Sequence, residues 1–110
     1  MQKLSLDALA RELLEKAAGT AVGRASRTVV GGHEKVLRQT VIAMTKDTAL
    51  TEHANPGEAS VHVLRGRVRL IAGNDTWDGR DGDLLIIPDA SHSLKALQNS
   101  AVLLTVAKRP

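Results

Sequence analysis

The chain has 110 residues with the hydrophobic and charged fractions of an ordinary soluble protein, so one domain with its own core is expected. Its net charge of +3 is scattered and Trp77 is its single aromatic residue, which excludes a nucleic-acid partner held by base stacking. The lack of cysteine excludes disulfides and thiol chemistry, and the lack of long apolar runs and of a secretory pattern favours a cytoplasmic protein with no membrane partner.

Residues 4 to 18 form the one convincing helix in the sequence. Leu6, Leu9 and Leu13 recur at the spacing of a single helix face, Ser5 can cap the start, and a glycine follows the end. An apolar stripe of this kind must be buried. We expect it to pack on the body of its own domain; the alternative is that it is presented to a partner protein and the rest of the chain is scaffold.

After the helix the sequence changes to the period of two that is typical of strands. Short stretches rich in Gly, Asn, Asp, Ser and Pro separate six such segments. The predicted strands are 36–44, 59–64, 67–72, 83–88, 92–97 and 101–107. Strands at this spacing predict an all-β sandwich or barrel with one amino-terminal helix. Residues 1–35 would supply the helix and a lead-in strand, and residues 36–110 the barrel, within a single domain.

Two of these strands contain the runs "LLII" and "AVLLTV", which are apolar on both faces. In an antiparallel sheet this pattern indicates that both faces are covered. The inner face would meet the core, and the outer face would meet the helix or a second subunit. A homodimer is therefore expected.

Arg65, Arg67 and Arg69 recur at a period of two and would share one face of a strand. One interpretation is a stripe that binds phosphate. The other, which we favour, is an ordinary solvated face. The nearby stretch "GRDGD" contains glycines, but it lacks the strand-to-helix context of a phosphate loop.

Two segments, "HANPGEASVHVLRG" (53–66) and "GDLLIIPDASH" (82–92), carry the motifs on which a family resemblance depends. The first resembles the first motif of the cupin superfamily, with Gly66 as its closing glycine and Asp47 in place of its opening glycine. The second resembles the second cupin motif through Gly82, Pro88 and His92. The resemblance covers residues 36–107 and implies a jelly-roll β-barrel like that of the short single-domain bacterial cupins.

Metal-binding cupins hold a divalent ion inside the barrel with three His and one Glu, and an open coordination position does the chemistry. The resemblance places His53 and His92 as metal ligands and Asn55 where a second His is usual. The Glu position falls on Ala59, and Glu58 lies one residue early. Asn55 and Glu58 are further candidate ligands, but the favoured interpretations are a turn-capping Asn55 and a Glu58 facing solvent, unless a bulge turns it inward.

The resemblance also implies a ligand pocket, with His53, Asn55, Trp77 and His92 as its candidate residues. Trp77 either closes one end of the barrel or forms a pocket wall. Because the metal set is depleted, we favour a protein that binds a small organic ligand, with Zn, Ni, Fe or Mn at partial occupancy as its cofactor. The alternative is a metal-dependent enzyme, a dioxygenase or an isomerase, acting on a small substrate.

Overall fold

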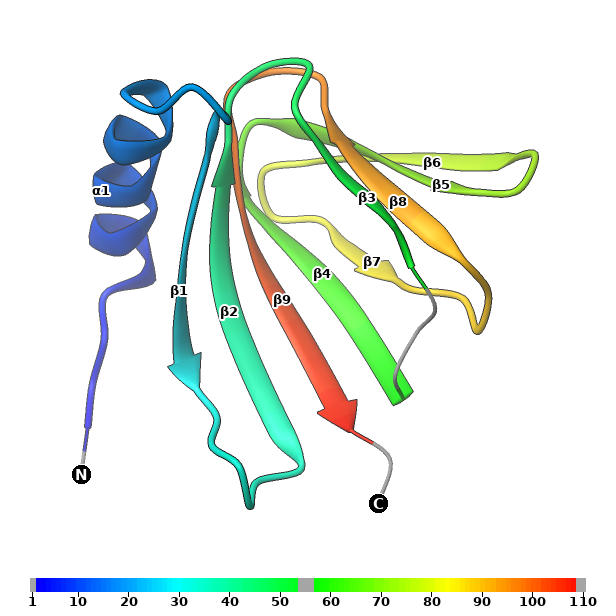
Figure 1. The fold of residues 1–110 in the computed structure, drawn as a ribbon, viewed down its shortest axis with the longest axis horizontal. Coiled ribbons are helices and arrows are strands. Elements are labelled where there is room, and N and C mark those ends of the chain that lie inside the picture. The colour runs from blue at the N-terminus through cyan, green and yellow to red at the C-terminus, as the bar shows by residue number, and fades with distance from the viewer. Residues whose placement is uncertain (1, 54–56, 109–110) are drawn as a thin grey trace.

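The computed structural model describes residues 2–53 and 57–108, with the backbone alone at positions 52, 53 and 57. Within these residues the chain forms one helix and nine strands, and the strands build two antiparallel sheets that face each other (Figure 1). The elements are α1 (Leu6–Ala18), β1 (Arg24–Val30), β2 (Leu37–Met44), β3 (Ala49–His53), β4 (Gly57–Arg65), β5 (Arg67–Ala72), β6 (Asp75–Arg80), β7 (Leu84–Ile86), β8 (His92–Ala96) and β9 (Ser100–Lys108).

The two sheets have the strand orders β1-β2-β9-β4-β7 and β3-β8-β5-β6. Strands of both sheets alternate along the chain, as they do in jelly-roll folds. The main core lies between the sheets and is aliphatic, as the near-absence of aromatic residues requires. Its buried members are Ile42, Met44, Val61, Val63, Val68, Leu70, Ile87, Leu94, Ala96 and Val102. The all-β barrel with one amino-terminal helix is thereby confirmed.

The helix α1 covers the outer face of the five-stranded sheet beside β1 and β2 (Figure 1). The Ser5 side chain caps it by accepting the Ala8 N–H at 3.1 Å. Leu9 and Leu13 are buried against residues of β2 and β9, which include Leu103. The predicted packing of the helix on its own domain is confirmed. In the part of the chain that the structure describes, no helix is long and apolar enough to cross a membrane.

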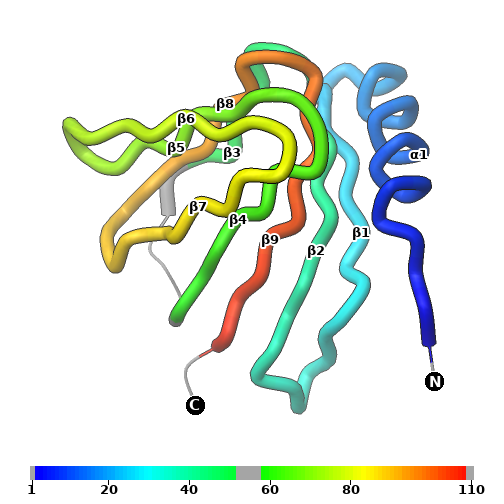
Figure 2. Tube along the Cα trace, turned by 180° about the vertical axis from the view of Figure 1, so that it is seen from behind, coloured from blue at the N-terminus to red at the C-terminus, as the bar shows by residue number. Residues whose placement is uncertain are grey.

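The strand β6 runs through residues whose sequence predicts a turn. It is extended because every residue from Asp75 to Arg80 has a partner on β5, from Ala72 to Arg67. Pairing therefore overrides a local preference for turn formation. The resulting β5–β6 hairpin projects from the second sheet, as Figure 2 shows from behind, and it turns at Gly73, where a turn is predicted.

Gly66 separates the three arginines that the sequence places on one strand face. Its φ of 91° turns the chain from β4 into β5, so Arg65 lies on a different strand from Arg67 and Arg69. A Cβ at this position would lie 2.5 Å from the Asn99 carbonyl oxygen, which is why the closing position of the motif needs glycine.

Each of these arginines is close to a carboxylate. The Arg65 Nη2 lies 2.8 Å from the Asp7 carboxylate, and so links β4 to the helix. Arg69 binds Asp78 with its Nε at 2.7 Å, and Arg67 lies 3.7 Å from the same carboxylate. The expectation that all three arginines share one strand face is wrong, because Arg65 lies on β4, while Arg67 and Arg69 lie on β5.

The edge strand β7 carries the run "LLII", and its two faces have different surroundings. Leu85 packs against the core between the sheets. Leu84 and Ile86 are 58% and 70% exposed on the outer face, opposite His62 and Ser60 of β4. The helix therefore covers the outer face of β9 at Leu103 but leaves this part of the sheet open.

Candidate functional site

A small cavity lies between the two sheets. Its volume is about 30 Å³, which is room for a group about the size of one water molecule. Eight of the ten described residues that line it are aliphatic, and the polar exceptions are His92 and Ser93 of β8. The full lining is Ile42, Leu50, Val61, Leu70, Ile87, His92, Ser93, Leu94, Val102 and Leu104.

The strand β8 directs His92 into this cavity. Every second residue of the strand is buried, so His92, Leu94 and Ala96 share the inward face. His92 is only 6% exposed, and its Nδ1 lies 3.0 Å from the Ala90 carbonyl oxygen. Because a carbonyl oxygen can only accept, Nδ1 donates this hydrogen bond and carries a proton. Histidines that bind metals in proteins are oriented in this way.

A bulge in β3 brings the backbone of His53 next to that of His92. Leu50 of β3 pairs with Leu94 of β8, and His53 pairs with His92. The two pairs are three residues apart on β3 but only two apart on β8, so β3 contains one extra residue. The histidines of the two motifs thus occupy opposite positions on adjacent strands. The His53 side chain and the whole of Asn55 lie outside the described residues.

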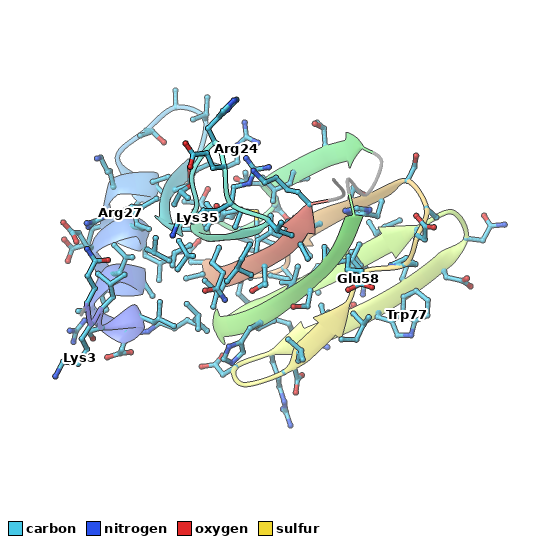
Figure 3. All side chains as sticks on the ribbon, turned by 90° about the horizontal axis from the view of Figure 1, so that it is seen from below. Lys3, Arg24, Arg27, Lys35, Glu58 and Trp77 are labelled. Carbon is cyan, nitrogen blue, oxygen red and sulfur yellow. The ribbon has the colours of Figure 1, made fainter. Side chains whose placement is uncertain are left out.

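The other candidates lie away from the cavity. Glu58 is exposed on β4 (Figure 3), while Ala59, the next residue, packs against the core. Trp77 is half-exposed on the edge strand β6, opposite Leu70, and does not line the cavity. Among the residues that the structure describes, no three His, Asp or Glu side chains come together as a metal site.

The sequence did not indicate the aliphatic part of the cavity lining. Ile42 is on the inward face of a predicted strand, which is a usable signal. Leu50 belongs to β3, whose residues the strand prediction did not include. These residues meet through the pairing of distant strands, and local periodicity does not reveal such pairing.

Several solved protein structures share this architecture. No protein-family profile and no curated protein match the chain. A conserved Streptococcus pyogenes protein of unknown function is similar in structure, with a TM-score of 0.74 and 27% identity over 83% of this chain and 79% of that one. A cupin superfamily protein from Desulfitobacterium hafniense has a TM-score of 0.72 and 13% identity over 78% of each chain. KdgF from Halomonas has a TM-score of 0.64 and 19% identity over 78% of this chain and 82% of its own.

Two facing antiparallel sheets, an interior histidine and these structural relatives define the class: the molecule is a cupin-fold protein. More particularly, it is a small domain with the cupin fold and one helix on the outer face of its five-stranded sheet. The resemblance of the two sequence motifs to cupins is confirmed at the level of the fold.

Proposed function

We propose that this protein binds a small organic ligand inside the barrel, with His92 as the polar side chain that meets the ligand. One observation carries the proposal: His92 is buried at 6% exposure in the wall of an otherwise mostly aliphatic cavity. Burying a polar group is unfavourable, so such a group usually has a structural or functional reason.

The second buried polar side chain of the described residues, Ser100, provides a contrast. Its hydroxyl donates to the Gln98 carbonyl oxygen at 2.7 Å and accepts the Arg67 N–H at 3.0 Å. Those contacts fix the β8–β9 connection to the turn at Gly66, so Ser100 has a structural role. His92 differs in its position: it lines the cavity, and its Nδ1 donates to the Ala90 carbonyl oxygen.

A divalent ion at partial occupancy forms part of the proposal. The backbone pairing of His53 with His92 supports two imidazole ligands, which suit Zn, Ni and Fe better than Mn. Two imidazoles hold such an ion less firmly than three imidazoles and a carboxylate. The alternative function, a metal-dependent dioxygenase or isomerase, requires the fuller ligand set together with tight binding.

Calorimetric titration with Zn²⁺ and Ni²⁺ tests the metal part. The protein as purified should carry substoichiometric metal or none, and in the titration we expect weak binding by the wild type, abolished in His92→Ala and retained in His62→Ala, whose side chain is on the outer face of β4. The double change Asn55→His with Ala59→Glu should raise the affinity by at least about tenfold, the scale of effect that even an outer partner of a metal ligand produces. Glu58→Ala is the matched control: it removes the carboxylate next to position 59 and should change the metal affinity little.

Two results would redirect the proposal. Tight one-to-one binding by the wild type would favour the enzyme. Binding that survives His92→Ala but disappears in His62→Ala would place the metal on the outer face of the sheet and would contradict the interior site.

We also propose that a second copy of the chain covers the outer face of β7. Leu84 and Ile86 are adjacent apolar side chains at a sheet edge that the helix does not reach. A two-fold axis beside β7 would bring the same residues of both copies together, which makes the contact closed and self-complementary. A solvated apolar edge would otherwise favour aggregation.

A further inference from the structure

A second hollow adjoins the cavity between the sheets. It lies at β1, the edge strand of the five-stranded sheet, and has a volume of about 360 Å³, within the range of organic ligand pockets. Ile42 and Leu50 line both this hollow and the cavity that contains His92. We call the outer hollow the vestibule; its remaining lining is Val22, Arg24, Ala25 and Ser26.

The strand register directs Arg24 and Ser26 toward the inside of the barrel. Arg24 pairs with Met44 and Ser26 with Ile42, and both partners belong to the core between the sheets. Residues that oppose each other in an antiparallel pair share a face. In Figure 3, Arg24 lies on the side of the molecule that also carries β3.

Arg24 differs from the arginines of β4 and β5 in its charge balance. Arg65, Arg67 and Arg69 all lie near carboxylates. The Arg24 guanidinium is exposed and makes no ion pair with the described residues, although it borders a hollow with mainly aliphatic walls. An unpaired guanidinium beside apolar surface is complementary to an organic anion.

We propose that the ligand is a short-chain carboxylic acid that enters through the vestibule. This inference rests on the proposed function and names its ligand class. The carboxylate would pair with Arg24 beside the Ser26 hydroxyl, and the hydrocarbon chain would pass over Ile42 and Leu50. The far end would reach the cavity at His92, whose volume limits it to about the size of a methyl or hydroxyl group.

The composition of the vestibule favours a carboxylate over a phosphate ester. One guanidinium and one hydroxyl match a single negative charge, whereas phosphate sites combine several cations or backbone N–H groups. A nucleotide would also need a surface for its base, and Trp77, the single aromatic residue, is on β6 in the other sheet and lines neither hollow.

Titrations with butanoate and butanamide, followed by NMR of the methyl groups and the His92 ring, test the inference. The two probes have nearly the same shape and differ in charge. At low salt we expect butanoate to bind the wild type roughly two to five times more tightly than butanamide, the range of an exposed ion pair. Both probes should shift the signals of Leu50, Leu94 and His92.

Arg24→Gln should abolish the preference for the acid. Arg27→Gln is the matched control, because it removes the same charge from the same strand, but opposite Val41, on the face that the helix covers. The preference for butanoate should survive in this control.

Each contrary result has a distinct meaning. Equal binding of the two probes, or equal losses in Arg24→Gln and Arg27→Gln, would overturn the acid assignment while leaving a ligand at His92. Displacement of butanoate by inorganic phosphate at equal concentration would overturn the preference for a carboxylate. No shift at His92 with either probe would overturn the inference and also contradict the proposed function for this ligand size.

Discussion

Asp47 adopts a backbone conformation that residues with a side chain rarely use. Its φ is 72°, in the left-handed region, and it occupies the position where the cupin motif has its opening glycine. The turn is held from both sides: the Asp47 N–H donates to the Ala96 carbonyl at 2.8 Å, and the Thr45 and Thr48 hydroxyls are 3.0 Å apart. A left-handed turn therefore stands at this position although the residue is not glycine.

Substitutions at this position should therefore reverse the usual order of stability, in which an alanine variant is more stable than a glycine variant. We expect Asp47→Gly to be more stable than Asp47→Ala by about 1 kcal/mol, because the left-handed conformation disfavours a Cβ. Urea denaturation of the two variants measures the difference. The neighbouring Lys46, which has no positive φ, should give the opposite order, with Lys46→Gly the less stable. The same order at both positions would contradict the strain at Asp47.

Among the elements, the helix α1 is held to the barrel by aliphatic contacts. Leu9 is buried against the outer face of the five-stranded sheet, whereas Leu4, just before the helix, is exposed. Leu9→Ala should lower the free energy of unfolding by about 2–5 kcal/mol, and Leu4→Ala by no more than about 0.5 kcal/mol. Denaturant unfolding measures both. Equal small effects would mean that the helix does not depend on this contact.

The ion pair between α1 and β4 should add a pH-dependent contribution. The hydrogen bond from Arg65, together with its charge, holds the pKa of Asp7 below its ordinary value of 3.8. Because the carboxyl pKa is lower in the folded than in the unfolded state, the ion pair stabilises the fold at pH values above the ordinary pKa. This stabilisation is lost as the pH falls through the pKa of the folded state.

Arg65→Gln should consequently lower the melting temperature slightly at pH 7 and not at all near about pH 2. Arg38→Gln is the control, since Arg38 is exposed and makes no ion pair with the described residues. Thermal unfolding of both variants at the two pH values measures these differences in melting temperature. A deficit in Arg65→Gln that persists at low pH would point to lost packing rather than lost charge.

Sequence reasoning recovered the elements that have strong periodicity. The helix and the strands β5 and β9 were located within a residue or two, the helix because its leucines recur at the helical period and the strands because they are short apolar segments between turn residues. The strand β6 was missed because Asp and Gly dominate it, and only its pairing with β5 makes it extended. The strand β7 is shorter than predicted because the sheet edge supports pairing only from Leu84 to Ile86.

The same distinction explains what could be predicted of the candidate site. His92 was found because it lies in a recognisable motif on a regular strand. Arg24 and Leu50 were not found, because their place beside the cavity depends on pairings between strands far apart in the chain. The bulge that aligns His53 with His92 is likewise a product of strand pairing, and the spacing of the motif does not reveal it.

At the scale of the whole molecule, the outer face of the five-stranded sheet has two parts. The helix covers β1, β2 and part of β9, and the β7 edge remains open with Leu84 and Ile86 exposed. The proposed homodimer would cover the second part as the helix covers the first.

Sedimentation at tens of micromolar, on the order of usual assay concentrations, should therefore show a dimer. Ile86→Asp should shift the wild-type dimer toward monomer, because it would bury a charge at the contact. Val22→Asp, a change at an exposed apolar residue near β1, should leave the dimer intact. A wild type that sediments as a monomer, or a Val22→Asp variant that dissociates equally, would reject a contact at β7.

The position of β9 has a consequence for biosynthesis. This strand lies between β2 and β4 at the centre of the five-stranded sheet, yet it is made from residues 100–108. While a ribosome extends the chain, the edges of β2 and β4 that pair with β9 stay open, and the two strands cannot join one sheet until β9 emerges between them. Folding of this sheet should therefore await almost the whole barrel sequence, and a nascent chain stalled before residue 100 should be a client for chaperones that hold exposed strands.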